Sequence, residues 1–178
     1  MLIRNYGLFW RASEIDWNPG NGKRNAFRLL GRQGTNRPTV KLADFRFQNG
    51  IYILYGNYGP YYVGLARSEK GLGKRLKDHL SDKHADQWDR FSWFGFGATL
   101  GKDKTSGLCR VKPAAALSVG SASQVIADME ALLMKAMGTV NDADMKFQKG
   151  EIWHQVERDE TEQYLEKVSK KKKSVVKK

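Results

Sequence analysis

The stretch that most constrains the fold is GIYILYGNYGPYYVGLA, residues 50–66. Residues 50–56 and 61–66 are rich in Ile, Tyr and Val, which favour β-strands. The GNYGP between them has the composition of a tight turn, so the stretch predicts a β-hairpin. If the loop spans about three residues, Tyr52 and Tyr62 lie nearly opposite each other on one face of the sheet. A register slip by one residue would put them on opposite faces. Ordinary cross-strand packing of two residues that favour strands is the alternative interpretation.

The segment after the hairpin predicts an α-helix. Leu72, Leu76 and Leu80 recur every four residues and mark one buried side of the helix. Arg75 and His79 are also four residues apart, so they share a face beside that apolar stripe. Arg75 is a fixed cation with a forked set of donors, whereas His79 can exchange a proton near neutral pH. Two basic residues on a solvated helix face are the alternative interpretation.

Two further segments follow this helix. Residues 90–97, RFSWFGFG, predict a third strand, and residues 98–120, which are rich in Gly, Ser and Lys, predict a loop or irregular segment.

A second helix is predicted after Ser121, which can form a capping box with Gln124, and it should end at Gly138. Glu130 falls at the edge of its apolar face, where a carboxylate can point into a cleft, although a surface position is the alternative. The expected apolar face consists of Val125, Met129, Leu132, Leu133 and Ala136.

Length and charge narrow the class of protein. The chain has 178 residues, which fits one domain, and its formal net charge is +12. Seven lysines lie in residues 167–178, but residues 1–49 also carry nine Lys or Arg against three acidic residues. The positive charge therefore predicts a polyanionic partner, of which nucleic acid is the commonest. A soluble basic protein with an added Lys tail is the alternative.

Cysteine and histidine usage give no sign of a metal cluster. Cys109 is the single cysteine, so no internal disulfide can form, and the three histidines are scattered along the sequence. No apolar run approaches the ~18 residues of a membrane span, and Arg4 and Asn5 interrupt the apolar residues near the start. We therefore expect a cytoplasmic protein with no membrane partner.

Taken in chain order, GIYILY, YYVGLA, GLGKRLKDHL and MEALLMKAM, followed by Asn141, resemble the motifs of the GIY-YIG nuclease family over roughly residues 45–147. The resemblance implies an α/β (α+β) fold, in which a compact domain has a central, mainly antiparallel three-stranded sheet flanked by helices. The expected organisation is a small, basic, β-rich N-terminal extension (1–49), the nuclease core (50–150), an acidic short C-terminal helix (151–166) and a Lys-rich disordered tail (167–178).

The function that the resemblance implies is a metal-dependent endonuclease that hydrolyses DNA phosphodiester bonds. Glu130 would hold one Mg²⁺ or Mn²⁺ per active site, and Arg75 would clamp phosphate oxygens. Tyr52 would act as the general base or position the attacking water, and Tyr62 and His79 would orient it.

Two departures from the family pattern concern residues that would contact nucleic acid. Leu65 follows the glycine of YVG where many members have a polar residue, so Arg67 or Lys74 would supply that function. Asn141 follows the Glu130 helix at a shorter spacing than is usual and without the common Pro, which leaves Asp142 as a substitute.

The N-terminal residues are the expected source of substrate preference. Arg28 follows Phe27 and Arg46 lies within DFRF, and this interleaving of basic and aromatic residues suits phosphate tracking or base stacking. It equally suits an ordinary small sheet with basic edges. With no zinc finger or helix-turn-helix pattern, a restriction-like or mobile-element-associated nuclease is expected rather than a homing endonuclease.

Two other functions remain open. One is a catalytically inactive nucleic-acid-binding module with a degenerate GIY-YIG fold, and the other is an interaction protein whose basic tail docks acidic partners. Cleavage specificity, strand preference, pathway and the choice between monomer and homodimer do not follow from the sequence.

Overall fold

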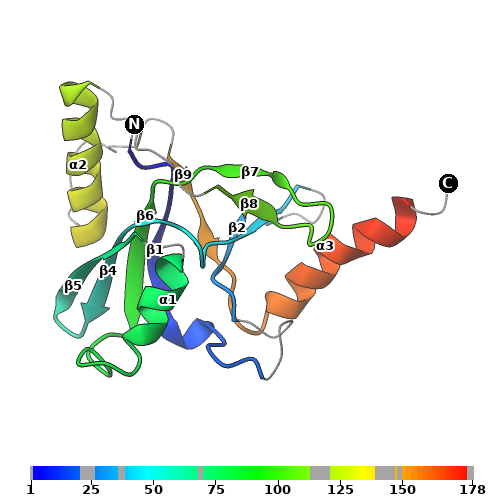
Figure 1. Ribbon diagram of the computed structural model, residues 1–178, viewed down its shortest axis with the longest axis horizontal. Helices are drawn as coiled ribbons and strands as arrows, with labels where there is room; N and C mark the ends of the chain where they lie inside the picture. The colour runs from blue at the N-terminus through cyan, green and yellow to red at the C-terminus, as the bar shows by residue number, and fades with distance from the viewer. Residues whose placement is uncertain are drawn as a thin grey trace.

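The computed structural model describes residues 2–20, 27–35, 39–67, 70–112, 121–138, 147 and 150–175. The described residues form a mixed α/β fold with three α-helices and two mixed five-stranded sheets (Figure 1). The elements in chain order are β1 (Asn5–Arg11), the short 3-10 helix η1 (Ala12–Glu14), β2 (Leu30–Gln33), β3 (Lys41–Asp44), β4 (Gly50–Gly56), β5 (Gly59–Ala66), α1 (Gly71–Asp78), β6 (Arg90–Gly95), β7 (Thr99–Lys102), β8 (Cys109–Val111), α2 (Ala122–Met137), β9 (Glu151–Ile152), β10 (His154–Gln155) and α3 (Thr161–Val175).

The first sheet has the strand order β5-β4-β6-β1-β9. The strands β5, β4 and β6 pair antiparallel, as predicted from residues 50–56, 61–66 and 90–97. The expected three-stranded sheet is nevertheless too small, because β1 pairs antiparallel with β6 and parallel with β9. β6 pairs with β4 along one edge and with β1 along the other, and its residues 91–95 are all buried. Residues 1–49 thus contribute a central strand of this sheet.

The second sheet has the order β10-β2-β3-β8-β7. Two of its strands, β7 and β8, lie in the segment that the sequence predicts as a loop. They are only four and three residues long and lie in a segment rich in Gly, Ser and Lys, so local propensity does not reveal them. Pairing with each other and with β3 supplies the stabilisation instead. Residues 113–120 lie outside the described residues.

The hairpin of β4 and β5 is tighter than predicted. Gly56 pairs with Gly59, so the loop contains only Asn57 and Tyr58. The register shifts between Leu54, which pairs with Tyr62, and Tyr55, which pairs with Pro60, and this shift marks a bulge. Tyr52 consequently pairs with Gly64, while Tyr62 pairs with Leu54. Because the displacement from the predicted register is even, Tyr52 and Tyr62 still share a face of the sheet.

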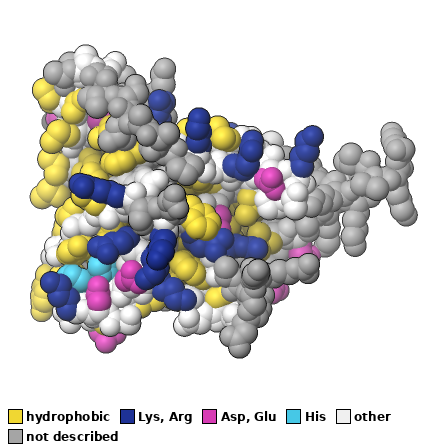
Figure 2. All heavy atoms as spheres, viewed as in Figure 1, with side chains coloured by type: hydrophobic (Ala, Val, Ile, Leu, Met, Phe, Trp, Pro, Cys, Tyr) yellow, Lys and Arg dark blue, Asp and Glu magenta, His cyan; other side chains and the backbone are white. Residues whose placement is uncertain are grey.

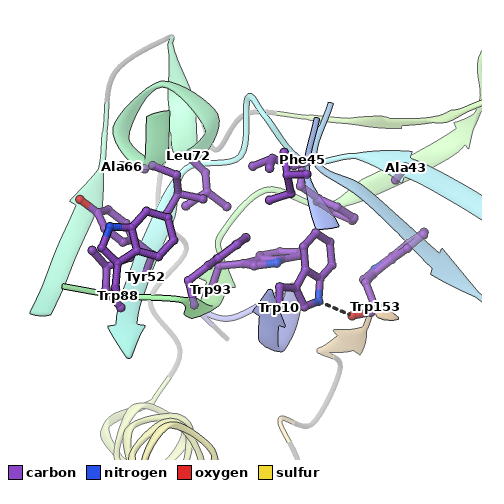
Figure 3. Close-up of a cluster of buried hydrophobic side chains, with 14 of the residues drawn as sticks. Trp10, Ala43, Phe45, Tyr52, Ala66, Leu72, Trp88, Trp93 and Trp153 are labelled. Carbon is purple, nitrogen blue, oxygen red and sulfur yellow. Dashed lines mark hydrogen bonds between the residues drawn. The ribbon is translucent and has the colours of Figure 1, made fainter. Parts of the chain in front are cut away.

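The two faces of β4 pack against different helices. Tyr52 belongs to a buried cluster that contains Leu76 of α1 and a row of aromatic side chains, in which Trp93 lies between Tyr52 and Trp153 (Figure 3). On the other face, Tyr55 belongs to a second cluster with Ala131 and Ala136 of α2. The helices α1 and α2 therefore cover opposite faces of β4.

The ends of α2 agree with the sequence, but its buried side does not. Ser121 and Gln124 form the predicted capping box, and Gly138 ends the helix with φ 64°. Of the expected apolar face, Ala136 is buried, whereas Met129 is 58% and Leu133 is 56% exposed. Asp128 is buried instead, because its carboxylate accepts a hydrogen bond from the backbone N–H of Leu2 at 2.9 Å.

The C-terminal region differs from the expected short helix and disordered tail. Residues 151–155 form β9 and β10, and α3 then continues through the lysines to Val175. Lys is a good helix former, and a helix anchored by buried Tyr164 propagates more easily than it nucleates. Within the described ranges, the helices are too short or too polar to cross a membrane.

Candidate active site

A group of aromatic and imidazole rings lies where β4, β5 and the turn after α1 meet. The ring centroid of Tyr52 is 6.2 Å from that of Tyr62 and 5.7 Å from that of His79. The Tyr62 ring lies 5.2 Å from His79 and 4.5 Å from His84. The structure thus brings together the predicted residues Tyr52, Tyr62 and His79, and adds His84 to them.

Hydrogen bonds join three of these side chains into a chain. The Tyr52 hydroxyl lies 2.8 Å from Nε2 of His79, and Nδ1 of His79 lies 2.7 Å from a carboxylate oxygen of Asp82. A carboxylate only accepts hydrogen bonds, so the arrangement puts the imidazole proton on Nδ1. Nε2 then accepts from Tyr52. The imidazole is 2% exposed, and Trp88 holds the residue through a 3.3 Å bond from its indole N–H to the His79 carbonyl.

The glycine of YVG allows Tyr52 to reach His79. The Tyr52 ring crosses β5 over Gly64, where an added Cβ would lie 2.2 Å from both Cζ and the hydroxyl oxygen. Real Cβ atoms do not approach other atoms so closely, so this position requires glycine. The segments GIY and YVG are therefore linked by one packing constraint, because the side chain of Tyr52 occupies the space that a side chain at Gly64 would need.

Arg75 lies beside the Tyr52 hydroxyl and has one buried donor atom without a partner among the described residues. The nearby Tyr52 hydroxyl raises the pKa of Arg75, so the guanidinium stays charged. Its Nε is buried and makes no hydrogen bond to any residue that the structure describes. A buried cationic donor without a partner is costly, and an anion bound at this position would satisfy it.

Two groups of the hydrogen-bonded chain have shifted acidities. Burial raises the pKa of Tyr52 to about 12, although Arg75 opposes the shift. Tyr52 is therefore a neutral phenol at neutral pH, which is the wrong direction for a general base. Partial desolvation alone would raise the pKa of Asp82, but bonds from the His84 backbone N–H and the His79 ring outweigh it and lower that pKa.

Asp82, His84 and Tyr61 are residues that sequence reasoning missed. One ligand atom of His79, one of Asp82 and one of His84 all lie within 4.8 Å of one another. The expectation that the histidines are scattered is therefore wrong for His79 and His84, because the turn after α1 folds them together. The Tyr61 hydroxyl lies 3.2 Å from Nδ1 of His84. In the sequence, the short spacing of His79, Asp82 and His84 within HLSDKH was the pattern that could have indicated this cluster.

Basic side chains gather around the histidines on this face of the molecule (Figure 2). Of the residues expected to contact nucleic acid here, Arg67 is exposed at the end of β5. Lys74 forms an ion pair with Asp78. Both positions are compatible with a phosphate backbone passing over α1.

Arg46 and Arg28, which were also expected to contact nucleic acid, do not gather at this cluster. Arg46 pairs with Asp44 at 2.8 Å and so has a structural partner. Arg28 is exposed and lines a separate groove of about 560 Å³ beside the start of α3. Asn141 lies outside the described residues.

The N-terminal aromatic residues are mainly core residues. Trp10 is 2% exposed, and Phe45 is fully buried. Of the two interpretations of the N-terminal segment, the ordinary small sheet with basic edges therefore fits Trp10 and Phe45, because their buried rings offer no surface for base stacking.

Glu130 does not join the Tyr52 cluster. It is exposed on α2, among the exposed apolar side chains Ile126, Leu133 and Met137. The buried residues Ala131 and Ala136 of the same helix pack on the face of β4 opposite to Tyr52.

No family model, no curated protein and no solved structure matches this chain. The resemblance to GIY-YIG nucleases therefore stays a prediction that rests on the motifs and on the geometry around Tyr52.

Proposed function

We propose that this protein is an endonuclease that hydrolyses the phosphodiester bonds of DNA. The observation that carries the proposal is the convergence of Tyr52, Tyr62, Arg75 and His79 on one face of the sheet, with a buried donor of Arg75 that has no partner among the described residues. Hydrolysis of a phosphodiester needs a cation for the phosphate oxygens and a polar group that positions a water, and this cluster offers both.

Arg75 supplies the phosphate site. Its guanidinium is charged and lies within reach of the Tyr52 hydroxyl, so an anion bound to it would sit next to that hydroxyl. A forked cation matches the geometry of two phosphate oxygens and stabilises the charge that builds up on them during attack.

Tyr52 and His79 supply the groups that handle the water. The hydrogen bond to Nε2 of His79 fixes the Tyr52 hydroxyl, and Asp82 fixes the imidazole in turn. In the reaction the water oxygen bonds to phosphorus, one ester P–O bond breaks, and the leaving oxygen takes up a proton from solvent water, to which the protonated His79 later returns its own. The proton that the water loses passes to the Tyr52–His79–Asp82 chain, which holds it at nitrogen.

The family resemblance implies a Mg²⁺ or Mn²⁺ ion, and the position of Glu130 shows whether this residue can hold such an ion beside Arg75. Mg²⁺ prefers carboxylate and water oxygens, and the expected ligand was Glu130. Glu130 is exposed on a helix that packs on the other face of β4, so this residue does not fit an ion that acts beside Arg75. We therefore assign phosphate binding and water positioning to side chains on the Tyr52 face.

The proposal is tested by nicking of supercoiled plasmid DNA by the full chain with Mg²⁺, Mn²⁺, Zn²⁺ or a chelator. Replacing Arg75 by Ala should slow cleavage at saturating DNA by roughly 100-fold or more, the scale expected for a lost transition-state donor. Arg75→Lys should restore little of it, because Lys lacks the fork. Arg90→Ala is the matched control, since Arg90 is an exposed arginine that pairs with Asp89.

The alternative of an inactive binding module predicts a different result in the same assay. Under that alternative, the wild-type chain would bind DNA, and no metal condition would yield nicked plasmid above the level of the Arg75→Ala variant. Such a result would reject the nuclease proposal.

A further inference from the structure

The turn after α1 presents a compact set of metal donors. We propose that His79, Asp82 and His84 bind one divalent transition-metal ion of the zinc type. Their ligand atoms lie within 4.8 Å of one another. Zinc binds imidazole nitrogen and carboxylate oxygen at about 2.0–2.2 Å, so two ligands of one ion are at most ~4.4 Å apart. Small side-chain movements are therefore enough to close the three donors around an ion.

Each imidazole is already oriented by a tyrosine. The Tyr52 hydroxyl bonds to Nε2 of His79, and the Tyr61 hydroxyl bonds to Nδ1 of His84. The ring nitrogens that these tyrosines leave for an ion are Nδ1 of His79, which faces Asp82, and Nε2 of His84. Metal-bound histidines commonly use their second ring nitrogen in this way, which fixes both the ring position and the tautomer.

The backbone holds the third ligand in place before any ion arrives. One carboxylate oxygen of Asp82 accepts a hydrogen bond from the His84 backbone N–H at 2.8 Å, and the other lies 2.7 Å from Nδ1 of His79. The turn is closed by a 3.1 Å bond from the Asp82 backbone N–H to the Asp78 carbonyl. An ion would replace the proton that His79 and Asp82 now share, without rebuilding the turn.

The donor types favour a transition-metal ion over Mg²⁺. Two imidazoles and one carboxylate suit Zn²⁺ and its neighbours, whereas Mg²⁺ and Ca²⁺ select oxygen ligands. The Asp82 side chain is 39% exposed, so solvent can reach the fourth coordination position. Three protein ligands with one open position are typical of catalytic rather than structural zinc sites.

The proposal that His79, Asp82 and His84 bind a metal ion does not depend on the proposed function. Only the use of the ion in hydrolysis rests on the proposed function. An ion at an open site lowers the pKa of a bound water toward neutrality. With Nδ1 of His79 taken, the imidazole proton moves to Nε2, and His79 then donates to the Tyr52 oxygen. In the metal-bound form His79 therefore accepts no proton, and the lowered pKa of the metal-bound water takes the place of the proton relay. Tyr52 keeps its place beside Arg75, where it can orient the water toward a bound phosphate.

Metal binding is measured on the full chain after chelator treatment and dialysis, by calorimetric titration with Zn²⁺ and by visible absorption with Co²⁺. We expect one ion per chain. His84→Gln and Asp82→Asn should each weaken binding at least about tenfold. Asp82→Asn can still accept the bond from the His84 backbone, so the turn should persist. The matched control is His154→Gln, which alters an exposed histidine in β10 and should bind as the wild type does. Circular dichroism confirms folding.

Two results overturn the site. One is a wild-type chain that takes up no Zn²⁺ at micromolar concentrations, and the other is a folded His84→Gln variant that binds Zn²⁺ as tightly as the wild type. Plasmid nicking on the same preparations separates the two proposals. Zinc binding without cleavage would keep the metal site and reject the nuclease, whereas cleavage by a chain that binds no Zn²⁺ would do the reverse.

Discussion

The packing of Tyr52 over Gly64 makes a sharp prediction for Gly64→Ala. The new Cβ would lie 2.2 Å from the ring of Tyr52, which is fully buried. Tyr62 and His79 flank that ring, with centroids 6.2 and 5.7 Å away, so it cannot move aside freely. Overpacking of this kind costs about 1–3 kcal/mol. With a urea m-value of about 2 kcal/mol/M, the unfolding midpoint should fall by roughly 0.5–1.5 M.

A double-mutant cycle shows whether the Tyr52 ring is the cause. In a Tyr52→Leu background the ring is gone, so Gly64→Ala should lose most of its effect, with a coupling of at least about 1 kcal/mol. Gly101→Ala is the control, because no atom of the described residues lies within 4 Å of a Cβ at that position. Equal destabilisation by Gly64→Ala in the two backgrounds would refute the reasoning.

Three further outcomes follow from single side chains. Burial raises the pKa of the Cys109 thiol, so its neutral form stabilises the fold; in urea unfolding from pH 7 to 10, stability relative to Cys109→Ala should fall as pH rises beyond the usual thiol pKa of about 8.5. Hydrogen bonds from the backbone and hydroxyl of Ser106 lower the pKa of Asp103. Asp103→Asn should therefore destabilise the protein at pH 7, and its difference from the wild type in the same assay should vanish as pH falls below about 3.9. Glu130→Gln should leave the plasmid nicking rate unchanged, whereas the family resemblance predicts its loss.

The features that the sequence predicts, the hairpin and the shared face of Arg75 and His79, depend on patterns between residues close in the chain. The Ile-, Tyr- and Val-rich runs around GNYGP predict the hairpin, and any even register keeps Tyr52 and Tyr62 on one face. The four-residue spacing of Arg75 and His79 puts them on one face, with Arg75 in the last turn of α1 and His79 at its C-terminal cap. These contacts span few residues, so local composition and periodicity determine them.

The parts that could not be predicted depend on contacts between distant segments. β1 lies beside β6 through backbone pairing with residues 90–95, and no local signal in residues 5–11 indicates that pairing. The periodicity of the sequence predicts that α2 has an apolar side, but it does not predict which side of the helix packs against the sheet. The cluster of His84 with His79 needs the turn after α1, whose conformation is fixed by hydrogen bonds such as that from Trp88 to the His79 carbonyl.

The most direct test of the central claim is the single-turnover cleavage rate of Tyr52→Phe at saturating DNA. This change removes only the hydroxyl that bonds to His79 and keeps the ring in the core. The account predicts a folded variant that binds DNA as the wild type does and cleaves it about 100-fold more slowly or worse, the scale of a lost acid–base or positioning group. A folded Tyr52→Phe variant that cleaves at the wild-type rate would contradict the assignment of this cluster as a hydrolytic site.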